Sequence, residues 1–256
     1  MDIMTTDNIL IRHSQKSGAL GAVWLVHGFG ESGGIFTESF SSVLAGRFSL
    51  FAPDFPGYGA SPFRPESKTI AAATQILVEL IEKFSGNLPV FLVAHSLGGI
   101  IATGAAARLG PRVRAYANIE GNLTKDDTFV TGLSAGFTDA EAFKRHLIDL
   151  FLPAASEDEI LLRWVSDLSA AHPEALLTWA RECVSATGEQ SAGQAYRDLA
   201  CRTLYLWGEK TASKRSRDFL EKSGMDNRGF AGCGHLPMVE KPDECWGAVS
   251  DFFTAV

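Results

Sequence analysis

The segment Val93-Ala94-His95-Ser96-Leu97-Gly98-Gly99 (residues 93–99) follows an apolar stretch and opens a run of small residues. It matches the G-x-S-x-G pattern of a nucleophile elbow, with Ala94 in the first glycine position. In such an elbow a strand turns sharply into a helix, so the residues two before and two after the serine must be small enough to pass each other. The pattern therefore predicts that Ser96 lies at the C-terminal edge of a sheet, at the start of a helix.

The surroundings of this serine favour acyl-transfer chemistry over a simple helix N-cap, which is the alternative for an isolated serine between small residues. A helix that begins after Ser96 directs its positive end and free N–H groups towards developing negative charge, so the Leu97 N–H is a candidate oxyanion donor. The segment 26–30, Val-His-Gly-Phe-Gly, follows an earlier apolar run and offers the Phe29 N–H as a second donor. Its glycines allow the backbone to turn inward. The alternative for this segment is a tight turn without a catalytic role.

A candidate general base lies near the C-terminus, in Gly232-Cys233-Gly234-His235-Leu236-Pro237. This segment follows a short run that ends at Phe230. An imidazole held between a glycine and a proline-bearing loop after the last strand suits a base that must reach the serine, so His235 has the strongest context of the six histidines. We expect His27 to fix its own loop by hydrogen bonding and His95 to support the elbow.

Strand-like and helix-like runs alternate along most of the chain. Short apolar runs rich in branched or aromatic residues predict buried parallel strands at residues 23–26, 48–52, 89–94, 114–119 and 203–207. Between them, residues 70–84 and 97–109 show helical patterns. Strands separated by helices need crossover connections, which indicates a parallel sheet in an α/β fold. We expect residues 8–13 to add an edge strand.

Residues 121–199 break this alternation. They hold 13 acidic against 6 basic residues, whereas the rest of the chain holds 17 of each. Only helix patterns occur in this stretch, and their start signals are two capping boxes and a proline suited to a first helical position: Thr138 with Glu141, Ser156 with Glu159, and Pro173. We therefore predict an α/β core of residues 1–120 and 200–256, and an all-helical cap of residues 121–199.

Four segments of the chain carry a family resemblance when they are taken together. They are His27-Gly28-Phe29-Gly30, Asp54-Phe55-Pro56-Gly57-Tyr58-Gly59-Ala60-Ser61, Ala94-His95-Ser96-Leu97-Gly98-Gly99 and Gly234-His235-Leu236-Pro237-Met238-Val239-Glu240-Lys241-Pro242. In this order they resemble the α/β-hydrolase superfamily, and within it the serine hydrolases with a helical cap. The resemblance implies a mostly parallel eight-stranded sheet flanked by helices, a cap inserted after strand six, and hydrolysis through an acyl-enzyme.

One element of the family pattern is missing. Family members usually place the third residue of the catalytic triad, an acid, in a stretch resembling G-x-x-D just after strand seven. Here that stretch is Gly208-Glu209-Lys210-Thr211, so a threonine stands where the aspartate is expected. The chemistry still requires a carboxylate on the far nitrogen of His235, because that carboxylate fixes the ring tautomer and stabilises the imidazolium.

Some family members place this acid after strand six instead. In this chain the predicted strand 114–119 is followed directly by Glu120, at the edge where the nucleophile is expected. We therefore assign Glu120 as the acid, with a loop carboxylate at the cap hinge as its alternative role. Glu209 and Asp218 are the fallback candidates for the acid.

Composition excludes several classes of protein. Apolar residues make up 46% and charged residues 21% of the 256 residues, so the chain can bury a full core. It has no run of 18 apolar residues, and its first residues carry Asp2 and Asp7, so we expect a soluble, cytoplasmic protein without a membrane partner. A net charge of −7 argues against nucleic-acid binding. The four cysteines are scattered, which indicates reduced thiols, and no metal or cofactor motif is present.

The expected function is that of a serine hydrolase acting on a small or medium carboxylic ester as its small-molecule acyl substrate. Phe143, Phe151 and Trp164 of the cap are candidates to line an acyl pocket, although apolar stripes at helical spacing usually form a core. Ser96 as the candidate nucleophile excludes the epoxide hydrolases and haloalkane dehalogenases of this superfamily, whose nucleophile is an aspartate. Thioester and C–C bond substrates stay open. So does a non-catalytic ligand receptor or scaffold on the same fold, for which Thr211 is the main support.

Overall fold

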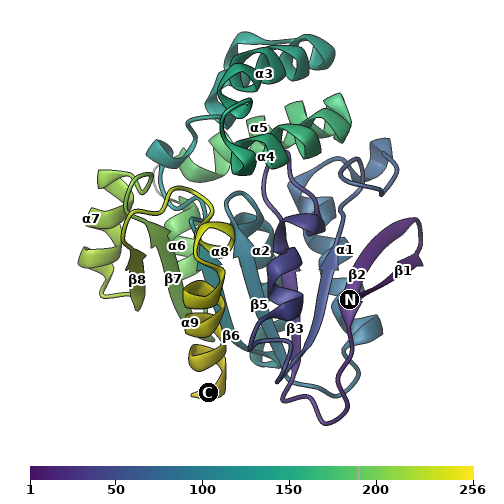
Figure 1. Cartoon of the computed structure of the whole chain (residues 1–256), viewed down its shortest axis with the longest axis vertical. Coiled ribbons are helices and arrows are strands. Elements are labelled where there is room, and N and C mark those ends of the chain that lie inside the picture. The colour runs from purple at the N-terminus through teal and green to yellow at the C-terminus, as the bar shows by residue number, and fades with distance from the viewer. Residues whose placement is uncertain (189–190) are drawn as a thin grey trace.

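A mixed eight-stranded sheet forms the centre of the computed structural model, which describes residues 1–188 and 191–256 (Figure 1). The strand order is β1-β2-β4-β3-β5-β6-β7-β8. β2 pairs antiparallel with β1 and β4, and the other neighbouring strands are parallel. This arrangement confirms the predicted fold class. The strands are β1 (Asp2–Thr6), β2 (Ile9–Ser14), β3 (Ala22–Val26), β4 (Ser49–Pro53), β5 (Val90–His95), β6 (Val113–Ile119), β7 (Arg202–Gly208) and β8 (Asn227–Phe230).

The strands predicted from apolar runs lie within one residue of their expected bounds at each end. The expectation for residues 8–13 is wrong in one respect, because that strand, β2, lies inside the sheet and β1 forms the edge. Asp7 and Asn8, with φ of 50° and 59°, make the tight turn between the two strands. Most of β1 is exposed, so its sequence lacks the apolar alternation by which a half-buried strand is recognised.

Helices cover both faces of the sheet. One face packs against α1 (Ile70–Phe84) and α2 (Gly98–Leu109), and the other against η1 (Gly33–Ser41) and α9 (Pro242–Thr254). Alternate residues of β3 enter the two cores, so its central part is buried on both sides. The other helices of the core are α7 (Lys214–Ser223) and α8 (Pro237–Glu240) with the short η2 (Pro65–Ser67) and η3 (Gly110–Arg112). None of the helices in the described ranges combines the length and the apolar character needed to cross a membrane.

The segment between β6 and β7 contains only helices in its described part, and it lies over one end of the sheet (Figure 1). Its helices are η4 (Lys125–Asp127), η5 (Thr131–Gly136), α3 (Ala140–Ala155), α4 (Glu159–Ala170), α5 (Pro173–Thr187) and α6 (Ser191–Arg197). Pro173 begins α5 as predicted. The other two start signals are displaced, because Asp139 caps α3 and Asp158 caps α4. Both aspartates accept backbone N–H groups of the first turn, and their charge also suits the positive end of the helix.

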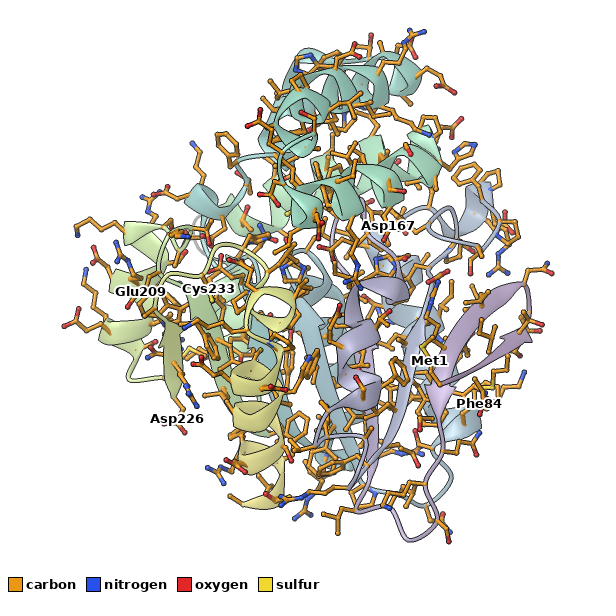
Figure 2. The ribbon with its side chains drawn as sticks, in the orientation of Figure 1. Met1, Phe84, Asp167, Glu209, Asp226 and Cys233 are labelled. Carbon is orange, nitrogen blue, oxygen red and sulfur yellow. The ribbon has the colours of Figure 1, made fainter. Side chains whose placement is uncertain are left out.

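Helix α4 joins this segment to the loop that follows β3. The Trp164 indole N–H donates to the Phe29 carbonyl at 3.0 Å. The Asp167 carboxylate accepts from the Ser32 backbone N–H at 3.0 Å and from the Ser32 hydroxyl at 2.9 Å. Figure 2 shows Asp167 where the helical segment meets the sheet layer. Burial raises the pKa of Asp167. These contacts fix α4 directly against the loop that carries Phe29.

Candidate active site

Ser96 lies in the sharp turn between β5 and α2. Its φ of 51° is in the left-handed region, which costs a residue other than glycine about 1–2 kcal/mol. The turn is held because the Ser96 N–H donates to the Ile119 carbonyl at 3.0 Å. Two glycines make room for it: a Cβ at Gly98 would clash with the Val26 carbonyl, and one at Gly28 would lie 2.9 Å from the Ser96 Cβ. The elbow therefore fits closely against the loop after β3.

That loop is held by hydrogen bonds on both sides of Gly28. Glu31 Oε2 accepts from the Gly28 N–H at 2.6 Å, and His27 Nδ1 donates to the Gly28 carbonyl at 3.0 Å. His27 Nε2 accepts from the Phe55 N–H at 3.2 Å, so the ring proton is on Nδ1. Burial lowers the pKa of His27, which keeps the ring neutral. His27 thus fixes its loop, as the sequence predicts.

The contact on the Gly28 carbonyl also orients the candidate oxyanion donor. This carbonyl and the Phe29 N–H belong to one peptide unit, which is planar and trans, so they point in opposite directions. Leu97, which carries the other candidate donor, directly follows the serine and occupies the N-cap position of α2. Leu97 therefore lies in the elbow at the N-terminal end of α2, and Phe29 lies in the loop that packs against the elbow.

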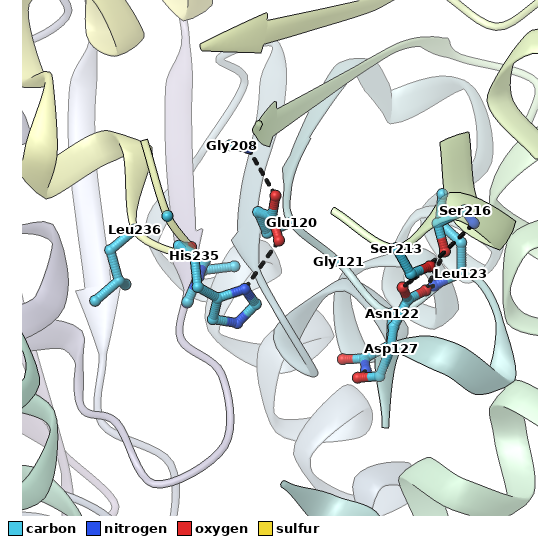
Figure 3. A network of polar contacts seen from close by, with 12 residues as sticks. Glu120, Gly121, Asn122, Leu123, Asp127, Gly208, Ser213, Ser216, His235 and Leu236 are labelled. Carbon is cyan, nitrogen blue, oxygen red and sulfur yellow. Dashed lines mark hydrogen bonds and ion pairs between the residues drawn. The ribbon is translucent and has the colours of Figure 1, made fainter. Parts of the chain in front are cut away.

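His235 contacts the carboxylate of Glu120 (Figure 3). The distance from His235 Nδ1 to Glu120 Oε2 is 3.0 Å, and Glu120 Oε1 accepts from the Gly208 N–H at 2.7 Å. Glu120 directly follows β6 with a φ of 48°, and its N–H donates to the Leu206 carbonyl of β7 at 2.8 Å. Its side chain is only 6% exposed, against 46% for that of His235. A fixed, buried carboxylate thus faces an imidazole that is open on its other side.

The protonation of this pair follows from its surroundings. Desolvation disfavours the charged ring, but the hydrogen bond and the charge of Glu120 outweigh it and raise the pKa of His235. The charges of Glu31 and Asp127 act in the same direction. When the ring is neutral, the carboxylate holds its proton on Nδ1, which leaves the Nε2 lone pair free to accept a proton. The geometry therefore suits His235 as a base.

A cavity of about 650 Å³ brings these groups together, because Phe29, Ser96, Glu120 and His235 all line it. Its apolar wall comes largely from the helical segment: Phe129, Val130, Phe151, Ile160, Leu161 and Trp164. Two of the three aromatic residues expected from the sequence, Phe151 and Trp164, thus lie in this wall. Phe143 does not, because it is fully buried and packs against Phe29 and Phe137.

The other carboxylates considered for His235 lie elsewhere. Glu209 is exposed, and Asp218 pairs with Lys214 at 2.7 Å on α7. Thr211, at the position where the family pattern expects the acid, lines the cavity without contributing a carboxylate. Among these candidates, only Glu120 contacts the imidazole.

Two further carboxylates near the site gave no signal in the sequence. Asp127 accepts from the Leu123 and Thr124 N–H groups at 2.9 and 2.8 Å, and from the hydroxyls of Ser213 and Ser216 (Figure 3). It thereby holds the chain that follows Glu120. Glu31 pairs with His95 under the elbow. A single acidic residue in a loop, like Glu31, or in a three-residue helix, like Asp127, shows no periodicity, so only the fold reveals these partners.

A serine elbow beside a histidine–carboxylate pair, at the carboxyl edge of a mixed eight-stranded sheet, is the arrangement of the α/β-hydrolase fold. The chain matches the family model described as "Alpha/beta hydrolase family" over residues 25–248. The protein therefore belongs to the α/β-hydrolase family. A thermophilic esterase from Thermogutta terrifontis has a similar structure, with a TM-score of 0.76 and 19% identity, covering 96% of this chain and 94% of that chain.

Sequence relatives with functional names are also found. One is the dihydrolipoyllysine-residue acetyltransferase component of the acetoin cleaving system of Cupriavidus necator, which is 25% identical over 93% of this chain. The match spans only 65% of that relative's length. Another is the pimeloyl-[acyl-carrier protein] methyl ester esterase of Neisseria meningitidis serogroup A, 27% identical over 93% of this chain and 78% of the relative.

Proposed function

We propose that this protein is a serine hydrolase that cleaves carboxylic esters through an acyl-enzyme. The observation that carries the proposal is the convergence of Ser96, in its strained elbow, and the His235–Glu120 pair on one cavity. The esterases among the protein's relatives and structural neighbours support the same class of reaction.

In the proposed reaction, the Ser96 hydroxyl attacks the ester carbonyl while its proton passes to His235 Nε2. The oxyanion of the tetrahedral intermediate accepts hydrogen bonds from the Phe29 and Leu97 N–H groups. Its collapse breaks the bond to the alcohol oxygen, which takes the proton from His235. Water then attacks the acyl-enzyme with His235 again as the base, and this step releases the acid and frees the serine.

Glu120 has two roles in this proposal. It holds the His235 proton on Nδ1, and its charge stabilises the imidazolium that forms when the serine loses its proton. The Gly208 N–H occupies the second carboxylate oxygen, so the side chain is held in one orientation. Glu120 thereby supplies the carboxylate that Thr211 cannot.

The cavity favours an uncharged acyl group of small or medium size. Its volume is typical of a site for one small molecule, and the wall contributed by the helical segment is apolar and partly aromatic. The described lining contains one lysine, Lys210, against the acidic residues Glu31, Glu120, Asp126, Asp127, Asp158 and Glu240. An anionic acyl group would meet like charge there, so we propose neutral esters as the preferred substrates.

A series of p-nitrophenyl esters from acetate to decanoate tests the reaction and the size of the acyl group. We expect hydrolysis by the wild-type protein, a fall in kcat/KM beyond medium chain length, and loss of turnover in Ser96→Ala. A fluorophosphonate probe is expected to label the wild type once, at Ser96, and to inactivate it. A wild-type protein that neither turns over these esters nor reacts with the probe would refute the proposal and favour a ligand receptor on this fold.

A further inference from the structure

His95 and Glu31 form a buried pair beneath the elbow. The His95 side chain is fully buried and that of Glu31 is 3% exposed, and the distance from His95 Nδ1 to Glu31 Oε1 is 2.7 Å. The contact places the His95 ring against the Glu31 carboxylate without the alignment of a hydrogen bond. Because His95 directly precedes Ser96, this pair lies at the base of the site without a part in the reaction proposed above.

The other nitrogen of His95 holds the loop of the candidate base. His95 Nε2 lies 2.8 Å from the His235 carbonyl oxygen, which can only accept, so Nε2 is the donor. The two rings also pack against each other, with centroids 4.6 Å apart. Glu120 therefore holds the side chain of His235, whereas His95 holds its backbone.

The other oxygen of Glu31 holds the oxyanion loop. Glu31 Oε2 accepts from the Gly28 N–H at 2.6 Å, on the peptide that precedes the one carrying the Phe29 N–H. A single chain of contacts thus runs from Gly28 through Glu31 and His95 to His235. It joins three loops that are distant in sequence, and each of them contributes a group to the proposed reaction.

The carboxylate in this chain of contacts is ionised. Desolvation alone would favour the neutral acid, but the neighbouring His95 outweighs it and lowers the pKa of Glu31, so the carboxylate stays ionised. Glu120 at the end of β6 contacts His235, and the His95 ring packs against it; the charges of Glu31 in the loop after β3 and of Asp127 in η4 also act on its pKa. A buried carboxylate that loses its partner is costly, so the two members of the pair depend on each other.

We propose that Glu31 and His95 are positioning residues of the hydrolytic site, a buried pair that fixes the oxyanion loop and the His235 loop against the nucleophile elbow. This inference rests on the proposed function, because it assigns the pair a role in the same reaction. Neither residue bonds to the substrate. They act by holding Gly28 and the His235 backbone in the geometry that the transition state requires.

The test compares Glu31→Gln, His95→Gln and the double variant with Glu38→Gln as the matched control. Glu38 is a paired carboxylate in the neighbouring η1, 2.6 Å from Arg163, and it lies outside the cavity lining. Two readouts are used: kcat and KM for p-nitrophenyl butyrate, and the titration midpoint of His235 from imidazole NMR signals. Thermal unfolding checks that each variant is folded.

We expect both single variants to lower kcat about 10- to 100-fold with KM within about twofold, since the apolar wall is untouched. The double variant is expected to lose about as much kcat as the more damaging of the two single variants, because the two residues act as one unit. In Glu31→Gln the His235 midpoint is expected to move to lower pH, whereas Glu38→Gln stays at the wild-type value.

Additive losses in the double variant, or an unchanged His235 midpoint and kcat in folded Glu31→Gln, would overturn the inference. If Glu31→Gln does not fold, the His95→Gln variant provides the test, because an unchanged kcat in that variant would refute the positioning role. Failure of the proposed function itself is recognised separately, because a wild type without Ser96-dependent hydrolysis still allows the NMR titration to report the effect of Glu31 on His235.

Discussion

Replacement of Glu120 by glutamine is the sharpest test of the assigned acid. The change preserves the size of the side chain and removes its charge. In the wild type one carboxylate oxygen accepts from the Gly208 N–H at 2.7 Å and the other from His235 Nδ1 at 3.0 Å. A glutamine has one carbonyl oxygen and one NH₂ group, so it can accept from only one of these two donors.

Each orientation of this glutamine has a cost that follows from the structure. With its oxygen on Gly208, the NH₂ group donates to His235 Nδ1 and forces the ring proton onto Nε2, where the base is needed; such a wrong tautomer costs about 10⁴-fold in kcat. With the amide reversed, the buried Gly208 N–H loses its acceptor at about 1–3 kcal/mol, and the imidazolium loses its counter-charge. We therefore expect kcat to fall about 10³- to 10⁴-fold, or about 4–5.5 kcal/mol.

The assay is steady-state hydrolysis of p-nitrophenyl butyrate over a range of pH. Because Glu120 raises the pKa of His235, the acid limb of kcat/KM is also expected to move to lower pH in Glu120→Gln. Glu209→Gln and Asp218→Asn are the controls and should leave kcat near the wild-type value. A Glu120→Gln protein that retains more than a tenth of the wild-type kcat, with an unmoved acid limb, would refute the assignment.

Three further predictions follow from contacts described above. In the wild type, kcat/KM should fall as the pH drops through a midpoint above the ordinary histidine value of about 6.5, because the base must be neutral and the pKa of His235 is raised; a rate that is flat down to pH 5 contradicts this. Trp164→Phe removes the hydrogen bond to the Phe29 carbonyl and should lower kcat about tenfold, measured with a short ester whose KM depends little on the cavity wall. Asp127→Asn weakens several buried hydrogen bonds and should lower stability by about 2–3 kcal/mol, measured by denaturant unfolding; an unchanged midpoint would show that the amide satisfies the same partners.

Much of the fold could be predicted because its strands are buried on both faces. Strands of this kind have short continuous apolar sequences, so the bounds of β3 to β7 could be predicted to within one residue. The edge strand β1 escaped prediction because it is largely exposed and carries no such pattern. The helix starts were predicted at the wrong residues because several neighbouring polar residues can serve as an N-cap. Only the folded chain shows that Asp139 and Asp158 accept the backbone N–H groups of the first turn.

The candidate site could be predicted only where glycines or a strand end mark a residue. Three features of the site are recognisable in the sequence in this way: the small residues around Ser96, the glycine before the histidine near the C-terminus, and the position of Glu120 directly after a strand. Glu31 has no such sequence pattern, because its role depends on His95, a partner 64 positions away in the sequence. Phe143 shows the opposite difficulty, because an aromatic residue on a helix has the same pattern whether it faces a cavity or a core.

The hydrogen bond from Trp164 to the Phe29 carbonyl links the two parts of the molecule that a protein engineer would most readily exchange. A chimera that receives the helical segment between β6 and β7 from another member of the family acquires a different cavity wall, but it also loses this indole unless the donor has one at the same place. Changes of specificity made by swapping this segment would then also lower turnover, and restoring the tryptophan should recover it.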